Sequence, residues 1–317
     1  MVTTEVGPEE FGRCACGAVR YVLKAAPMIV YACHCTDCQR LTGSAFIVSA
    51  WTEKTEVELR SGEMRQCRLA TGQRGSIVHF CGQCGTSIWT EYSQSFWFVR
   101  VATLDNQTTY PPQMHIWTQS KLPWLQLSDA VPSFETYYDR DKDWSAEGLA
   151  RHHSSSFWDG CGMSDQVTWM EGGCGCGAVR YALKAAPMIV HACHCTDCQT
   201  ISGGAFVINA WIERTQVELL SGVSASYRFA DEIRDNRVFF CPQCGTYVWT
   251  EYMKGFYFVR VGTLDDPTLL VLDMHIWTRS KQPWLPLSKG AQVFEEYYDK
   301  DKEWPADSLA HLAANAA

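Results

Sequence analysis

Cysteines dominate the chemistry that this chain could carry out. The 317 residues include 16 cysteines, and most of them stand two or three residues from another cysteine. Such short spacings are typical of metal sites, because a tight turn lets two thiolates face one ion at about 2.3 Å each. Glycine follows several of the pairs, and glycine accepts the positive φ angles that tight turns need. The cysteines therefore predict bound metal rather than a set of disulfides.

Three cysteine groups occur in order along the chain, and all three return 160 residues later. The first copy holds Cys14 and Cys16, then Cys33, Cys35 and Cys38, then Cys81 and Cys84. The second copy holds Cys174 and Cys176, then Cys193, Cys195 and Cys198, then Cys241 and Cys244. Seven cysteines per copy can form one closed four-thiolate site and one site with three protein ligands. Closed sites are usually structural, whereas three-ligand sites keep a position for water or substrate.

The spacing alone does not say which cysteine pairs share an ion. The most economical partition keeps Cys33, Cys35 and Cys38 together, since they supply three ligands within six residues. The other four cysteines of each copy then close the second site. Disulfides or inert buried thiols are an alternative, but an odd number per copy disfavours complete pairing. An iron–sulfur cluster is a further alternative, although the usual cysteine runs of such clusters differ from these.

The repeat extends beyond the cysteines and has the size of a domain. Residues 14–39 and 174–199 agree at 23 of 26 positions. A period of 160 residues is too long for a solenoid, whose units span about 20 to 50 residues. We therefore predict a domain at 1–150 with its motif core at about 10–130, a linker at 151–170, and a second domain at 171–317 with its core at about 171–290.

Short strands must position these cysteines, because the sequence between them is mostly β-like. Residues 18–23, 45–51, 55–59 and 95–102 are apolar, alternating, or rich in aromatic and β-branched side chains. The best helix candidate is short, at residues 35–41, and Gly43 follows it. We predict mainly β domains that are folded around metal and contain few short helices.

The cysteine motifs resemble those of a known family. Cys-x-Cys-Gly-Ala-Val-Arg-Tyr, Cys-His-Cys-Thr-Asp-Cys-Gln and Phe-Cys-x-x-Cys-Gly-Thr occur in this order, twice. They are similar to the motifs of the glutathione-dependent formaldehyde-activating enzyme family, also called the GFA or CENP-V family. The resemblance implies two tandem β-tent domains with two zinc ions per domain, four per chain. In the first copy it implies a structural zinc on Cys14, Cys16, Cys81 and Cys84 and a catalytic-type zinc on Cys33, Cys35 and Cys38, and the equivalent cysteines carry over to the second copy.

The function that we expect follows from the open three-cysteine sites and from this resemblance. Zinc held by three thiolates suits the binding of a thiol, which it deprotonates. The resemblance implies a carbon–sulfur lyase-type enzyme that adds a small-molecule thiol such as glutathione to formaldehyde, giving S-(hydroxymethyl)glutathione, or to another small aldehyde. Two alternatives stay open: a zinc-stapled binding module without catalysis, and a related zinc enzyme that acts on a different thiol or electrophile.

Composition excludes several other classes of protein. The formal net charge is -8 and no Lys/Arg-rich run is present, which argues against nucleic acid as a partner, since phosphate binding needs a basic face. No stretch approaches the roughly 18 to 20 apolar residues of a membrane helix. The first residues show no signal-peptide pattern, so we expect a cytoplasmic protein. The family often dimerises, so we also expect the two domains to pack as an intramolecular pseudo-dimer.

Other residues near the motifs have less specific interpretations. His34 lies between two ligand cysteines, so we expect its side chain to point away from the metal. His115 could supply a fourth ligand, but a buried histidine is the more common outcome, and the same holds for the counterparts of both in the second copy. Cys67 is replaced by Tyr227 in the second copy, and Cys161 lies in the linker. We predict that both are free thiols.

Overall fold

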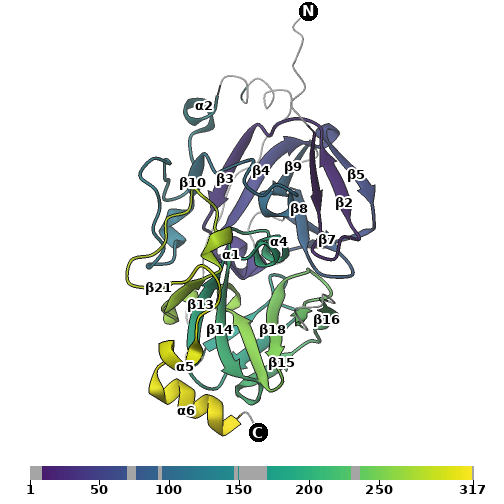
Figure 1. Cartoon of the computed structure of the whole chain (residues 1–317). Helices are drawn as coiled ribbons and strands as arrows, with labels where there is room; N and C mark the ends of the chain where they lie inside the picture. The colour runs from purple at the N-terminus through teal and green to yellow at the C-terminus, as the bar shows by residue number, and fades with distance from the viewer. Residues whose placement is uncertain are drawn as a thin grey trace, which may run out of the picture.

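Two similar sheet-rich halves make up the protein, one above the other in Figure 1. The computed structural model describes residues 9–69, 76–91, 95–145, 149, 170–229 and 236–315. Strands predominate and the helices are few and mostly short, which confirms the predicted fold class. The predicted linker, apart from Met170, lies outside the described residues, as does Cys161. Among the described helices, none has the length and hydropathy needed to cross a membrane.

A small sheet and a large sheet form the first half. Its strands are β1 (Glu10–Arg13), β2 (Arg20–Leu23), β3 (Ile29–Cys33), β4 (Ile47–Glu53), β5 (Val57–Ser61), β6 (Met64–Arg68), β7 (Ile77–Cys81), β8 (Ser87–Glu91), β9 (Phe96–Arg100) and β10 (Met114–Ile116). The small sheet has the order β1-β2-β5, and the large one has the order β10-β3-β4-β9-β8-β7-β6. All pairs in the large sheet are antiparallel except β10 with β3, which is parallel.

The second half repeats this arrangement with one additional short strand. Its strands are β11 (Met170–Gly173), β12 (Arg180–Leu183), β13 (Ile189–Cys193), β14 (Val207–Glu213), β15 (Val217–Ser221), β16 (Ala225–Arg228), β17 (Arg237–Phe240), β18 (Tyr247–Met253), β19 (Phe256–Arg260), β20 (Met274–Ile276) and β21 (Gln292–Val293). The small sheet has the order β11-β12-β15 and the large one β16-β17-β18-β19-β14-β13-β20-β21. Equivalent strands therefore place equivalent cysteines.

The described helices are few and mostly short. They are α1 (Thr36–Thr42), α2 (Arg140–Asp143), α4 (Thr196–Ser202), α5 (Lys300–Glu303) and α6 (Ala306–Asn315), with 3-10 turns η1 (Lys54–Glu56), η2 (Val101–Thr103), η3 (Thr118–Ser120), η4 (Arg214–Gln216), η5 (Val261–Thr263), η6 (Pro267–Leu269) and η7 (Thr278–Ser280). As predicted, α1 ends before Gly43. Its φ of 66° and the hydrogen bond from its N–H to the Gln39 carbonyl terminate the helix.

Each predicted strand segment contains a strand, with ends that shift by one or two residues. The segment at 55–59 starts late because its first residues belong to η1, so β5 runs over Val57–Ser61. Both ends of β3 and all residues between them are buried. A strand buried on both faces reads as a continuous apolar run rather than an alternation, which explains why Ile29–Cys33 carries no period-two signal.

Helices α1 and α4 lie at the junction of the two halves (Figure 1). Helix α1 contacts η5 of the second half, and α4 contacts η2 of the first. The equivalent side chains Phe46 and Phe206 meet edge to face there, with ring centroids 5.7 Å apart, and both are fully buried. Arg40 forms an ion pair with Asp265 across the junction at 2.9 Å. The two halves thus share one apolar core.

Candidate metal centres and the cavities beside them

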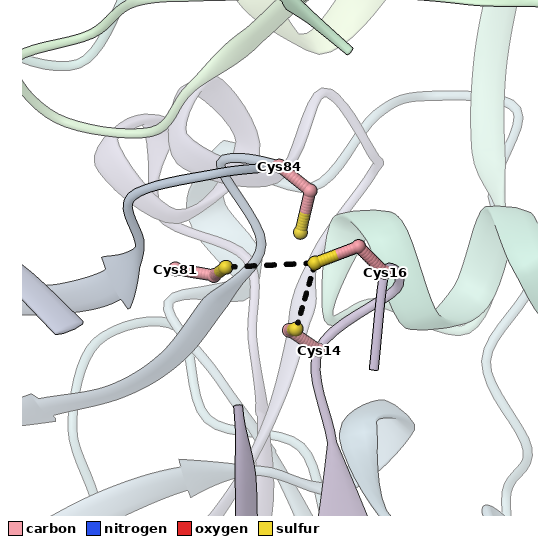
Figure 2. A group of neighbouring side chains, drawn as sticks. All are labelled: Cys14, Cys16, Cys81 and Cys84. Atoms are coloured by element: carbon pink, nitrogen blue, oxygen red, sulfur yellow. Dashed lines mark hydrogen bonds between the residues drawn. The ribbon is translucent and has the colours of Figure 1, made fainter. Parts of the chain in front are cut away.

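The first closed group consists of four cysteines whose sulfurs converge on one point (Figure 2). Its members are Cys14, Cys16, Cys81 and Cys84. The Sγ atoms lie within 4.8 Å of one another, with 3.3 Å between Cys14 and Cys16 and 3.7 Å between Cys16 and Cys81. Tetrahedral zinc at about 2.3 Å from each sulfur would set sulfurs about 3.8 Å apart, whereas a disulfide needs about 2.05 Å. The group therefore fits a metal ion, and its cysteines are not disulfide-bonded.

Tight turns on two different strands hold this group together. Gly85 adopts a φ of 81°, which lets the chain curl around the second cysteine pair. The Val19 amide donates to the Cys14 sulfur at 3.2 Å, and the Thr86 hydroxyl lies 3.2 Å from the Cys84 sulfur. The Ala15 amide also donates to the Thr86 hydroxyl, which ties the two turns to each other. Hydrogen-bond donors at the sulfurs favour the thiolate form that a metal requires.

The second copy repeats the closed group with nearly the same distances. Its members are Cys174, Cys176, Cys241 and Cys244. The Sγ atoms of Cys174 and Cys176 are 3.5 Å apart, and those of Cys176 and Cys241 are 3.7 Å apart. The Val179 amide again donates to the sulfur of Cys174, at 3.2 Å. The donor set of four sulfurs therefore fits zinc in both copies.

The two open groups each bring three sulfurs together at the junction of a strand and a helix. They are Cys33, Cys35 and Cys38 in the first copy and Cys193, Cys195 and Cys198 in the second. In each, one cysteine ends a central strand, one occupies the helix N-cap position and one lies in the first helical turn. Among the described residues, no other cysteine, histidine, aspartate or glutamate joins either group. The structure thus gathers the cysteines in the predicted partition of four and three.

A glutamine holds the backbone of each open group in place. In the first copy, the Gln39 side-chain amide donates to the carbonyls of His34 and Ser120, both at 2.7 Å. In the second copy, Gln199 donates to the carbonyls of His194 and Ser280. The glutamine therefore forms hydrogen bonds to backbone on both sides of the loop and helps to fix the relative positions of the three sulfurs.

Two buried histidines lie behind each open group and bond to each other. Nε2 of His34 is 3.0 Å from Nδ1 of His115, and the same atoms of His194 and His275 are 2.9 Å apart. Burial lowers the pKa of His115 and of His275 to about 4, so both rings are neutral at pH 7. The alternative of His115 as a fourth ligand gains no support from this geometry. Strand β10 also ends before Trp117, whose φ of 59° turns the chain away.

Each open group lines a cavity, and the two cavities differ in size. The first-copy cavity has a volume of about 30 Å³, room for one or two water molecules. The second-copy cavity has a volume of about 240 Å³, which admits a small organic molecule. Tyr31 lines the smaller cavity where His191 lines the larger one. The copies therefore carry the same sulfurs but offer different access to them.

A buried arginine lines each cavity, and the sequence interpretation missed both. Arg100 and Arg260 end the strands β9 and β19 and are each 3% exposed. The available signal was a charged residue that closes an apolar strand at the same place in both copies, Phe-Val-Arg-Val at 98–101 and 258–261. Charged side chains are almost never buried without a partner, so a charge repeated inside an apolar segment indicates a polar or functional environment.

The free thiol Cys67 reaches the closed group of the opposite copy. Burial raises the pKa of this thiol, and it shares a hydrogen bond with Cys176. Its counterpart, Tyr227, lies near the first closed group and packs with Ala15 in one small apolar cluster. Strand β6 and strand β16, which carry these residues, therefore each approach the Cys-x-Cys turn of the other half.

A known family model matches each half of the chain. The model of the family described as glutathione-dependent formaldehyde-activating enzyme (GFA) matches residues 10–120 and again residues 169–280. A crystal structure of a Rhodobacter sphaeroides protein from a structural-genomics programme is 23% identical over 30% of this chain and 88% of that chain, with a TM-score of 0.26. The curated proteins contained no match. The chain therefore belongs to the glutathione-dependent formaldehyde-activating enzyme family and carries its domain twice.

Proposed function

We propose that this chain is a zinc-dependent carbon–sulfur lyase-type enzyme that promotes the addition of a thiol, such as glutathione, to formaldehyde or another small aldehyde. The observation that carries the proposal is the three-cysteine group at the wall of a cavity, present in both copies beside a separate closed group. Membership in a family named for formaldehyde activation with glutathione supports the reaction class.

The chain's own residues would hold the reacting groups together. Zinc on three thiolates would leave one position for a thiol and would favour its thiolate form. The sulfur then forms a bond to the aldehyde carbon, the carbonyl π bond breaks, and the oxygen takes up the proton that the thiol has lost. Gln199 fixes the loop of the open group in the second copy, and the cavity beside it has room for the aldehyde. Holding both reactants in one cavity lowers the entropic part of the barrier.

The test compares the rate of adduct formation with the spontaneous rate. Purified protein with four zinc ions is mixed with glutathione and formaldehyde, and S-(hydroxymethyl)glutathione is followed by NMR. Cys198→Ser removes a ligand from the open group with the larger cavity, and Cys38→Ser is its matched control in the first copy. We expect acceleration by the wild type and its loss mainly in Cys198→Ser. A wild-type rate equal to the spontaneous rate refutes the proposal and favours a non-catalytic binding module or another substrate.

A further inference from the structure

We infer that the second-copy cavity is a binding site for a carboxylate-bearing thiol and that Arg260 recognises the carboxylate. The inference rests on the proposed function only in taking this cavity as the place where a thiol substrate binds. Three observations carry it. The buried Arg260 has fewer hydrogen-bond partners than donors. Asn209 links it by hydrogen bonds to His191, and the first copy has different residues in place of Asn209 and His191.

Arg260 is a buried cation whose described partners are all neutral. Its guanidinium donates to the side-chain oxygen of Asn209 and, at 3.1 Å, to the hydroxyl of Thr250. Among the described residues, no carboxylate forms an ion pair with it, and its Nε has no hydrogen-bond partner. Arginine has five N–H donors, so these two hydrogen bonds do not use all the donors of the guanidinium. A buried charge without an opposite charge is costly, which makes the cavity favourable for an anionic group.

The hydrogen bond from Arg260 to Asn209 determines which nitrogen of His191 carries the proton. Its side-chain oxygen accepts from Arg260, so its amide nitrogen is the donor toward Nε2 of His191, 3.1 Å away. Nε2 of His191 is therefore an acceptor, and the neutral ring carries its proton on Nδ1. That Nδ1 is buried and has no partner among the described residues. His191 itself is fully buried, whereas Arg260 is 3% exposed and lines the cavity, so the guanidinium is the group that can donate to the two acceptor oxygens of a carboxylate.

The open group lies in the wall of the same cavity as these donors. Cys193, Cys195 and Cys198 line it together with Arg260 and His191. Asp197 also lines it, and an acidic side chain there disfavours a ligand with several negative charges. A small molecule that carries both a thiol and a carboxylate matches a cavity whose wall contains both the three sulfurs and the arginine.

The first copy lacks this arrangement although it keeps the arginine. Ser49 stands in place of Asn209 and accepts from Arg100 at 2.9 Å, and Tyr31 stands in place of the histidine. The first copy therefore has no histidine at this position, and the cavity that remains, about 30 Å³, is too small for an organic acid. The two copies therefore differ at the residues that would choose the ligand.

The experiment measures binding rather than turnover, with two matched probes. 3-Mercaptopropionate and its uncharged counterpart 3-mercaptopropionamide are titrated into the zinc-containing protein at pH 7 by calorimetry. We expect the wild type to bind the carboxylate about ten- to a hundredfold more tightly than the amide, the usual effect of hydrogen bonds to a charged group. Arg260→Gln should remove this preference and keep amide binding, whereas Arg100→Gln should leave the preference unchanged.

A second variant keeps the test valid if Arg260→Gln does not fold. The double substitution His191→Tyr with Asn209→Ser installs the first-copy residues, retains the arginine, and should abolish binding of both probes. Equal affinity of the wild type for the two probes, or an unchanged preference in folded Arg260→Gln, overturns the inference. A retained preference in a protein that does not accelerate formaldehyde addition would instead refute the proposed function alone.

Discussion

A substitution of Gly43 tests how closely the two halves pack, because this residue ends helix α1 of the first half and contacts Arg260 of the second. Its φ is 66°, in the left-handed region, and a Cβ atom built there would lie 2.8 Å from Cβ and 3.0 Å from Cγ of Arg260. Gly43→Ala therefore adds backbone strain and a steric clash at the same time. The clash falls on the stem of the arginine rather than on its flexible end, so it is not easily relieved.

The two contributions can be separated by a matched substitution. The left-handed conformation costs an alanine about 1–2 kcal/mol, and forcing an extra methyl into a packed contact costs about 1–3 kcal/mol. Gly43→Ala should thus lower the free energy of unfolding by about 2–5 kcal/mol. Gly290 also has a positive φ, 94°, but a Cβ atom there would meet nothing within 4 Å. Gly290→Ala should therefore lose only the strain contribution.

Urea-induced unfolding of the zinc-containing protein, followed by tryptophan fluorescence, measures both effects. We expect the unfolding midpoint to fall most for Gly43→Ala, less for Gly203→Ala, whose nearest contact with Arg100 is 3.1 Å, and least for Gly290→Ala. Gly43→Ala should also reduce the carboxylate preference of the second cavity, because it displaces the arginine. A midpoint for Gly43→Ala no lower than that for Gly290→Ala would refute the close packing on which this reasoning depends.

Three further predictions concern the metal groups and the core. Cys84→Ser removes one of four sulfurs from the first closed group, so zinc per chain measured by native mass spectrometry should fall from four to three; four zinc ions in the variant would contradict the assignment. Tyr247→Phe removes a hydroxyl that donates to the Cys84 carbonyl across the junction and should destabilise the protein by about 1–3 kcal/mol, because a buried acceptor loses its partner; an unchanged denaturation midpoint argues against this bond. Burial lowers the pKa of His275 to about 4 from 6.5, so the unfolded chain takes up the proton first, and stability falls as pH drops from about 6.5 through 4. In this window the free energy of unfolding of His275→Gln should fall less steeply with decreasing pH than that of the wild type, and the two slopes should differ by up to about 1.4 kcal/mol per pH unit. Equal slopes for the variant and the wild type in acid-denaturation series would exclude the effect.

The sequence predicted the cysteine groups because their geometry is largely local. A Cys-x-Cys or Cys-x-x-Cys turn brings its two sulfurs together wherever it folds, and Gly17 and Gly85, with φ values of 76° and 81°, mark such turns. The short helix at 36–42 was equally local, since Gly43 ends it. The number of sulfurs per copy then limited how the pairs could combine across the domain.

The polar side of the second cavity could not be predicted in the same way. Arg260 meets Asn209 because strands β14 and β19 pair in a register that places the two residues opposite each other. That register joins segments about 50 residues apart, and nothing in either segment specifies it alone. The arginine is also fixed by Gly43 of the other copy, a contact that exists only after the two halves have come together. The domain boundaries at 150 and 171 and the roles of the individual ligands stay predictions.

The shared junction has a consequence for the synthesis of this chain. Phe46 and the Cys84 carbonyl find their partners, Phe206 and Tyr247, only when residues about 160 positions later have been made. Synthesis proceeds at roughly 5 to 20 residues per second, so roughly 8 to 30 seconds pass before the first copy can form these contacts. All four cysteines of the first closed group belong to the first copy, so the zinc proposed there would need no residue of the second copy and would stabilise the nascent half during this interval. The order of events on the ribosome would then be metal first and partner second.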